Sequence, residues 1–195
     1  MNAEQFSDNI QSWMDLSGSG RHAEAEKFYY KELFEAVITA FCKKYTGRKT
    51  GGLLVSLLGF SPEPVILTAS LLQPATHLIV TTPLKQEIVQ VLEKYLQPGY
   101  QLVILEDTSF KTIYKRIKES LSDFPTSNIT VDITGGKKSM VAAAAIFAKD
   151  YGSEIVYVDF EVYLKELRKP KPGTEYLNVI YDPLTDQPET SIING

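Results

Sequence analysis

The sequence predicts an α/β fold, a mostly parallel sheet with helices on both faces and a helical appendage at the amino terminus. Two observations carry this prediction. Short apolar runs without polar alternation, which are typical of strands covered on both faces, recur between amphipathic helical segments from residue 51 onward. A regular alternation of this kind indicates parallel strands joined by right-handed crossovers.

The first fifty residues are predicted to form helices. Residues 3–16 carry apolar side chains at helical spacing, and residues 22–45 carry a longer stripe that ends near Gly47. The second stripe has two interpretations, packing on the main domain or pairing with a second copy or an effector. Residues 46–52 form the predicted connector.

The alternating part follows in order. The expected strands are 53–58, 78–81, 102–105, 128–133 and 155–160, with a further strand at 176–181. The expected helices are 62–72, 83–96, 110–121 and 137–150. The predicted organisation is therefore a helical segment at 1–50, the α/β domain at 51–183 and a polar tail at 184–195.

The composition of the chain argues against several classes of function. A net charge of −4 argues against a broad surface for long nucleic acid, so a polyanion would be held locally. The single cysteine, Cys42, excludes an internal disulfide, and two scattered histidines make a metal cluster improbable, so no metal and no cofactor are expected. No apolar run is long enough to span a bilayer, and the expected location is cytoplasmic.

The stretch Val131–Met140, VDITGGKKSM, changes from strand to glycine pair to lysine pair to helix. Backbone N–H groups at such a turn point outward beside the positive end of the helix dipole, which predicts an anion site. The nine expected ligand-binding residues are Gly59, Phe60, Ser61, Thr134, Gly135, Gly136, Lys137, Lys138 and Ser139. With the usual strand order, the two turns that hold them flank the point where the winding of the sheet reverses.

Two familiar phosphate motifs do not fit. The Walker A pattern requires a glycine at Val131 and a serine or threonine at Lys138, and the dinucleotide fingerprint requires spaced glycines. The stretch instead resembles the D-x-T-G-G-x-K-x-M signature of CARF domains, the CRISPR-associated Rossmann-fold sensors of cyclic oligoadenylates. Two further segments, Leu53–Pro64 and Arg168–Leu177, are similar to parts of this family.

The resemblance implies a Rossmann-like fold and a homodimer that binds a ring-shaped RNA, most often cyclic tetra-adenylate, in type III CRISPR antiviral defence. It leaves two functions open. One is a sensor that passes the signal to an effector. The other is a metal-independent ring nuclease that would use Ser61 and Lys137 or Lys138 as catalytic residues. A third interpretation is a domain that binds another nucleotide or only dimerises.

Three points stay open at this stage. The sequence does not fix the size of the ring or the effector that the amino-terminal helices serve. It also does not fix whether the chain is part of a larger or membrane-bound protein. Phe60 has two interpretations, a face for adenine or ordinary core, while Tyr157 is expected in the core and Asp132 is expected to support the turn.

Overall fold

The computed structural model describes residues 1–49, 51–122, 124 and 128–186. Its chain divides into two compact units. The helical unit comprises Met1–Arg48 and Val158–Tyr176, and the sheet unit comprises Lys49–Tyr157 and the residues from Leu177 onward. The helical unit also includes a later segment, Val158–Tyr176, which contains most of Arg168–Leu177. Most of the predicted tail lies outside the described residues.

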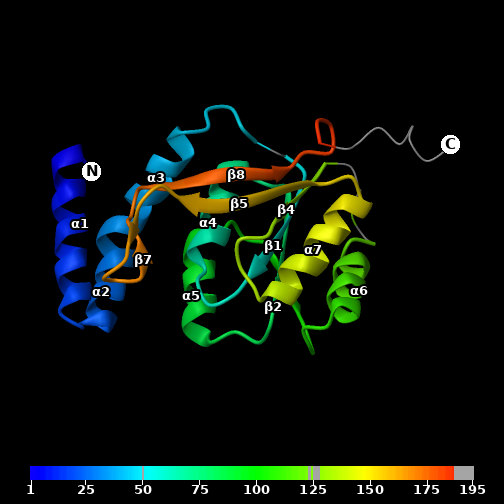
Figure 1. Ribbon diagram of the computed structural model, residues 1–195, viewed down its shortest axis with the longest axis horizontal. Coiled ribbons are helices and arrows are strands. Elements are labelled where there is room, and N and C mark those ends of the chain that lie inside the picture. The colour runs from blue at the N-terminus through cyan, green and yellow to red at the C-terminus, as the bar shows by residue number, and fades with distance from the viewer. Residues whose placement is uncertain (50, 123, 125–127, 187–195) are drawn as a thin grey trace. The chain divides into compact units, whose positions relative to one another are not determined.

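The sheet unit alternates strands and helices as the sequence predicted (Figure 1). Its elements are β1 Leu53–Leu58, α4 Glu63–Leu72, β2 Thr76–Thr81, α5 Gln86–Tyr95, β3 Gln101–Ile104, α6 Phe110–Ser120, β4 Ile129–Asp132, α7 Lys138–Asp150, β5 Glu154–Phe160 and β8 Glu175–Tyr181. Strands β5 and β8 run from one unit into the other.

The strands are ordered β3-β2-β1-β4-β5-β8. The pairs from β3 to β5 are all parallel, with Val55 of β1 beside Leu78 of β2 and Val131 of β4. Figure 1 shows β8 running opposite to β5 at the edge of the sheet. The usual order 3-2-1-4-5 of the first five strands and the additional last strand are confirmed, and the winding reverses between β1 and β4.

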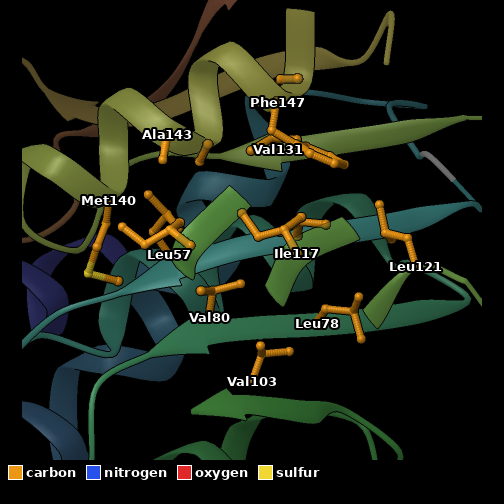
Figure 2. Close-up of a cluster of buried hydrophobic side chains, with 14 of the residues drawn as sticks. Leu57, Leu78, Val80, Val103, Ile117, Leu121, Val131, Met140, Ala143 and Phe147 are labelled. Atoms are coloured by element: carbon orange, nitrogen blue, oxygen red, sulfur yellow. The ribbon is translucent and has the colours of Figure 1, made fainter. Parts of the chain in front are cut away.

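The main core lies between the sheet and the helices α6 and α7 (Figure 2). Alternate strand residues point to this face, among them Leu57, Val80 and Val131, and Phe147 of α7 packs against them. All six residues of β1 are buried, because helices cover both faces of the sheet. Burial of each large apolar side chain stabilises the fold by about 1.5–3 kcal/mol.

A polar pair lies within this apolar sheet. The Ser56 hydroxyl of β1 lies 2.9 Å from Nε2 of His77 on β2, and both side chains are buried. Burial lowers the pKa of His77 to about 4, because an apolar surrounding disfavours the imidazolium ion. His77 is therefore a neutral structural residue and not a catalytic base.

The helical unit contains α1 Ala3–Gly18, α2 His22–Phe28, a π-helical turn Tyr29–Leu33, α3 Phe34–Lys43, and the short strands β6 Tyr163–Leu164 and β7 Lys169–Pro170. The predicted helix over 22–45 is thus one run interrupted by a π turn. Its core contains Ile10, Trp13, Ala25 and Leu33, with Leu164 and Leu167 of the β6–β7 hairpin packed against them. This packing explains why the hairpin belongs to the helical unit.

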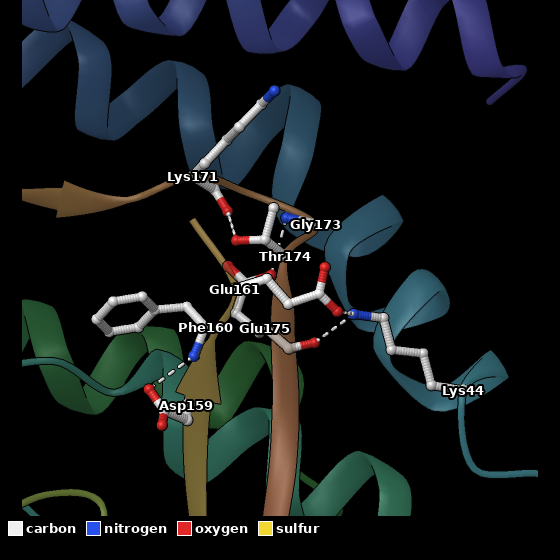
Figure 3. A network of polar contacts seen from close by, with 8 residues as sticks. All are labelled: Lys44, Asp159, Phe160, Glu161, Lys171, Gly173, Thr174 and Glu175. Atoms are coloured by element: carbon white, nitrogen blue, oxygen red, sulfur yellow. Dashed lines mark hydrogen bonds and ion pairs between the residues drawn. The ribbon is translucent and has the colours of Figure 1, made fainter. Parts of the chain in front are cut away.

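Lys44 ties the end of α3 to the base of this hairpin (Figure 3). Its ammonium group donates to the carbonyl oxygen of Glu175 at 2.9 Å and lies 3.4 Å from Oε1 of Glu161. The backbone N–H of Glu161 donates to the carbonyl oxygen of Thr174 at 2.9 Å. The two ends of the segment that contains the β6–β7 hairpin are therefore held together where they join β5 and β8.

Replacing His77 with glutamine tests the neutral state of the buried imidazole. The neutral form is favoured in the fold, so its contribution is complete above the unfolded pKa of 6.5 and is lost as the pH falls toward 4. We expect the wild-type free energy of unfolding, measured in urea, to fall between pH 7 and pH 4 by about 3 kcal/mol more than that of His77→Gln. Equal losses in the two proteins would contradict a buried neutral His77.

Candidate functional site

The predicted site residues lie on two turns at the carboxyl ends of β1 and β4. Gly59, Phe60 and Ser61 lie in the connection from β1 to α4, and residues 133–137 connect β4 to α7. Because β1 and β4 are adjacent and parallel, both turns leave the same edge of the sheet. The structure therefore brings together the two segments that the sequence singled out.

The two turns touch through their glycines. A Cβ atom on Gly135 would lie 2.2 Å from the carbonyl oxygen of Leu57 and 3.0 Å from the backbone nitrogen of Gly59. A Cβ atom on Gly59 would lie 3.0 Å from the backbone nitrogen of Gly136. Gly136 has a φ of +84°, in the left-handed region where other residues are strained. The contact thus requires glycine at Gly135 and leaves little room for a side chain at Gly59.

Asp132 supports the second turn from below. It is fully buried at the end of β4, and its Oδ1 accepts hydrogen bonds from the Thr134 N–H at 2.9 Å and the Thr134 hydroxyl at 2.5 Å. The expectation that Asp132 supports the turn agrees with these bonds. The Thr134 hydroxyl donates its proton to Asp132 in this structure.

The environment of Asp132 is strongly apolar. Burial raises the pKa of this carboxyl group to about 6, against the opposing effect of the hydrogen bonds from Thr134. The Thr68 hydroxyl of α4 is close enough to lower the pKa slightly, yet it makes no hydrogen bond of good geometry. The second carboxyl oxygen, Oδ2, is likewise buried without a hydrogen bond to the described residues.

The outward side of the turns carries exposed groups. Ser61, Lys137, Lys138 and Ser139 are exposed, and the side chain of Phe60 is 95% exposed. The interpretation of Phe60 as core is therefore wrong. Lys137 and Lys138 have no ion-pair partner among the residues that the structure describes.

The start of α7 concentrates positive potential. The helix has 13 residues, its first turn contains no acidic side chain, and no side-chain carboxylate or hydroxyl caps it. The first N–H groups of a helix lack intrahelical partners and carry about half a positive charge. Each lysine here is disfavoured by roughly 0.3–1 kcal/mol, and a bound anion would offset that cost.

Sequence reasoning missed part of this arrangement. It found both turns but not their glycine contact, and it gave no role to Thr68. Tyr157, expected in the core, is half-buried on β5. Within the described part of the chain, no group of three or more His, Cys, Asp or Glu residues is arranged to hold a metal ion, and no helix is long and apolar enough to cross a membrane.

Comparison of the sequence with known proteins finds a curated relative. No protein-family model matches the chain. The chain is 30% identical over 134 residues to the CRISPR system endoribonuclease Csm6 of Thermus thermophilus, an alignment that covers 66% of this chain and 29% of that protein. The chain thus corresponds to less than a third of the length of this relative.

Comparison of the fold finds solved structures. Can2 from Sulfobacillus thermosulfidooxidans in complex with cyclic tetra-adenylate aligns with a TM-score of 0.50 and 19% identity, over 75% of this chain and 40% of Can2. Csm6 of Enterococcus italicus bound to cyclic hexa-2′-fluoro-hexa-dAMP aligns with a TM-score of 0.48 and 13% identity, over 68% and 43% of the two chains. At this identity the match to Can2 shows a shared fold.

Replacing Gly135 with alanine tests the contact between the turns. The added methyl group would meet the Leu57 backbone at 2.2 Å, so we expect a loss of about 2–4 kcal/mol in the free energy of unfolding. Gly18→Ala is the matched control, because its methyl group would only reach a Leu167 side chain at 3.8 Å. Equal denaturation midpoints for the two variants would show that the turns do not meet as described.

The signature from Asp132 to Met140 lies at the switch point of the sheet. The sequence relative is a CRISPR protein, and the fold is shared with a protein solved with cyclic tetra-adenylate. These observations agree with the resemblance to CARF domains found in the sequence.

Proposed function

We propose that the chain binds cyclic oligoadenylate, with cyclic tetra-adenylate as the preferred ring, as a homodimeric sensor in type III CRISPR antiviral defence. One observation carries this proposal. Two glycine turns meet at the start of α7 and present two exposed lysines and exposed serine hydroxyls on one edge of the sheet. Phosphodiester groups match this combination of charge and donors.

The chemistry of the turn suits phosphate oxygens. Free N–H groups at the first turn of α7 would donate to them, while Lys137 and Lys138 supply charge. The hydroxyls of Ser61 and Ser139 are exposed and available as further donors. Gly59 and Gly136 leave the backbone open to close approach, since neither carries a side chain.

A second protomer would complete the site. A ring of four phosphates carries four negative charges, which two copies of Lys137 and Lys138 would balance. The outward side of α7 supports pairing with a twin helix, because Ala142 is exposed and Ile146 remains 47% exposed. Burying these apolar groups against their copies would remove them from water.

Phe60 is the proposed partner of a base. An aromatic ring that stays exposed at the edge of the anion site does not contribute the free energy of burial to the fold. Stacking of an adenine on this ring would recover part of that energy, and base–aromatic stacking contributes about 1–3 kcal/mol per base. Tyr157 is half-buried and is therefore a weaker candidate for stacking with a base.

Ring cleavage is the second candidate. The exposed Ser61 hydroxyl and the two lysines lie on the touching turns. There they would stabilise charge as a ligand 2′-hydroxyl attacks its adjacent phosphate and displaces the 5′-oxygen, which leaves a 2′,3′-cyclic phosphate and a protonated 5′-hydroxyl. His77 is buried against Ser56 and has a lowered pKa, so it offers no base at this turn. We therefore expect any cleavage to be slow.

The output of the sensor is a separate proposal. The curated relative is an endoribonuclease, and the chain spans 29% of its length, so that activity is not assigned to this chain. An effector would be reached through the helical unit, through a partner protein or through the dimer itself. The proposed location is the cytoplasm.

Replacing Lys137 and Lys138 together with alanine tests the anion site. We expect the affinity for cyclic tetra-adenylate, measured by isothermal titration calorimetry, to fall by about 100-fold, because two charge-assisted contacts are lost. Lys149→Ala is the matched control, since this lysine is exposed at the opposite end of the same helix. Its affinity should equal that of the wild type.

Unchanged affinity in the double variant would remove the α7 turn from the site. Chromatography of the same incubated ligand would separate the two candidate functions. An intact ring after long incubation supports the sensor, whereas a linear product that disappears in Ser61→Ala supports ring cleavage.

A further inference from the structure

The β6–β7 hairpin of the helical unit is strongly basic within an acidic protein. Its segment Val162–Gly173 contains one carboxylate, that of Glu166, whereas the whole chain has a net charge of −4. Its four cationic side chains are those of Lys165, Arg168, Lys169 and Lys171. Such a local reversal of charge is the electrostatic signature of a polyanion surface.

One face of the hairpin is occupied by the helical unit itself. Leu164 of β6 is paired with Lys169 of β7, and Leu164 packs with Leu167 against the helical core. The ammonium group of Lys169 lies 5.5 Å from the centre of the Trp13 ring. This face therefore serves packing and is closed to a ligand.

The opposite face is open and aromatic. Tyr163 and Pro170 form the adjacent pair of the hairpin, and successive residues of a strand point to opposite faces. The Tyr163 ring stacks on Phe160, with 5.5 Å between ring centres and an interplanar angle of 28°. Tyr163 is nevertheless 45% exposed and Pro170 is exposed. One face of the Tyr163 ring is thus covered by Phe160, and the exposed part of the ring, beside Pro170, is an aromatic platform available for stacking.

Two of the cations lie at the turn beyond Tyr163, whereas Lys171 is opposite Val162 and so lies on the same face of the hairpin as Leu164 and Lys169. Lys165 and Arg168 form the two ends of the turn beyond Tyr163, where the Arg168 N–H donates to the Lys165 carbonyl at 3.3 Å. At the other end, the Lys171 N–H donates to the Val162 carbonyl at 2.9 Å. Figure 3 shows the Lys171 ammonium group pointing away from the polar network at the hairpin base. Within the described residues, none of these three cations forms an ion pair.

Arg168 occupies its position at a conformational cost. Its φ is +52°, in the left-handed region that favours glycine or asparagine. The Arg168 side chain is exposed, so no packing explains the choice of a long residue at this point. A strained backbone that presents an exposed guanidinium group beside an aromatic platform points to a ligand for that group.

We propose that the outer face of the β6–β7 hairpin binds single-stranded nucleic acid, with a base stacked on Tyr163 and adjacent phosphates held by Lys165 and Arg168. A single strand exposes unpaired bases and phosphates in alternation. The bases stack on an aromatic surface, and the phosphates bind the neighbouring cations. A duplex keeps its bases stacked inside, so it would reach only the cations. This site is independent of the cyclic-oligoadenylate site proposed for the sheet unit.

Fluorescence anisotropy with a labelled, non-self-complementary 12-nucleotide RNA tests the site in the full chain. Tyr163→Ala should weaken binding about 5- to 100-fold, because base stacking is lost. Tyr163→Trp should retain it. Removal of one phosphate contact in Arg168→Asn should reduce the slope of log K against log salt by about 0.7.

Arg168→Asn also separates binding from folding. Asparagine tolerates the left-handed backbone, so the melting temperature of this variant should equal or exceed that of the wild type while its affinity falls. Lys27→Ala is the matched charge control, because Lys27 is an exposed lysine of α2 in the same unit. Its affinity for the RNA should not change.

Several outcomes would overturn the proposal. Undetectable binding of the RNA at 50 mM salt would reject it. Equal affinity for a 12-base-pair duplex, with no effect of Tyr163→Ala, would show a plain polyanion surface. Full displacement of the RNA by saturating cyclic tetra-adenylate, or loss of RNA binding in the Lys137→Ala, Lys138→Ala variant, would assign the binding to the α7 turn. A single-stranded DNA of the same sequence should bind comparably, because the platform contacts bases and phosphates.

Discussion

The site depends on the contact between two turns that approach too closely for any side chain. The backbone of Gly135 passes beside the Leu57 carbonyl, and a Cβ atom there would lie 2.2 Å from that oxygen. This approach places the start of α7 beside the turn that carries Phe60 and Ser61. Without it, the lysines and the aromatic ring would belong to separate surfaces. The anion site therefore depends first on the packing of the two backbone turns, which brings the charged groups together.

Buried polar groups stabilise this arrangement from within the sheet. Asp132 holds Thr134 through two hydrogen bonds and is itself fully removed from water. A carboxyl group in such a place is costly, which is reflected in its raised pKa. Above it, Lys137 and Lys138 lie at the positive end of a helix with no acidic neighbour in the first turn. Both features reduce stability and both orient groups toward a ligand, a pattern expected of functional sites.

Most of the sheet unit could be predicted from the sequence. Apolar runs such as Leu53–Leu58 are predicted as strands when turn residues lie at their ends. Their alternation with helices predicts right-handed crossovers. The exposure of Phe60 could not be predicted, since an aromatic residue after a buried strand suits core and surface equally. The contact of Gly59 with Gly136 was also hidden, because it joins residues far apart in the chain.

The helical unit shows a different limit of the sequence. Its helices were visible as apolar stripes, but the π turn at Tyr29–Leu33 leaves no pattern that separates it from a regular helix. The β6–β7 hairpin has strands of two residues, too short for a period of two to appear. Its membership of the helical unit follows from Leu164 and Leu167, whose partners lie some 150 residues earlier in the chain.

Amide chemical shifts during a titration with cyclic tetra-adenylate would test the central claim most directly. In a ¹⁵N-labelled protein, contact of phosphates with the glycine turn predicts the largest shifts, and slowed hydrogen exchange, at the N–H groups of Gly136, Lys138 and Ser139. Saturable binding that left these three amides unshifted, with changes confined to other parts of the sheet unit or to the helical unit, would contradict it.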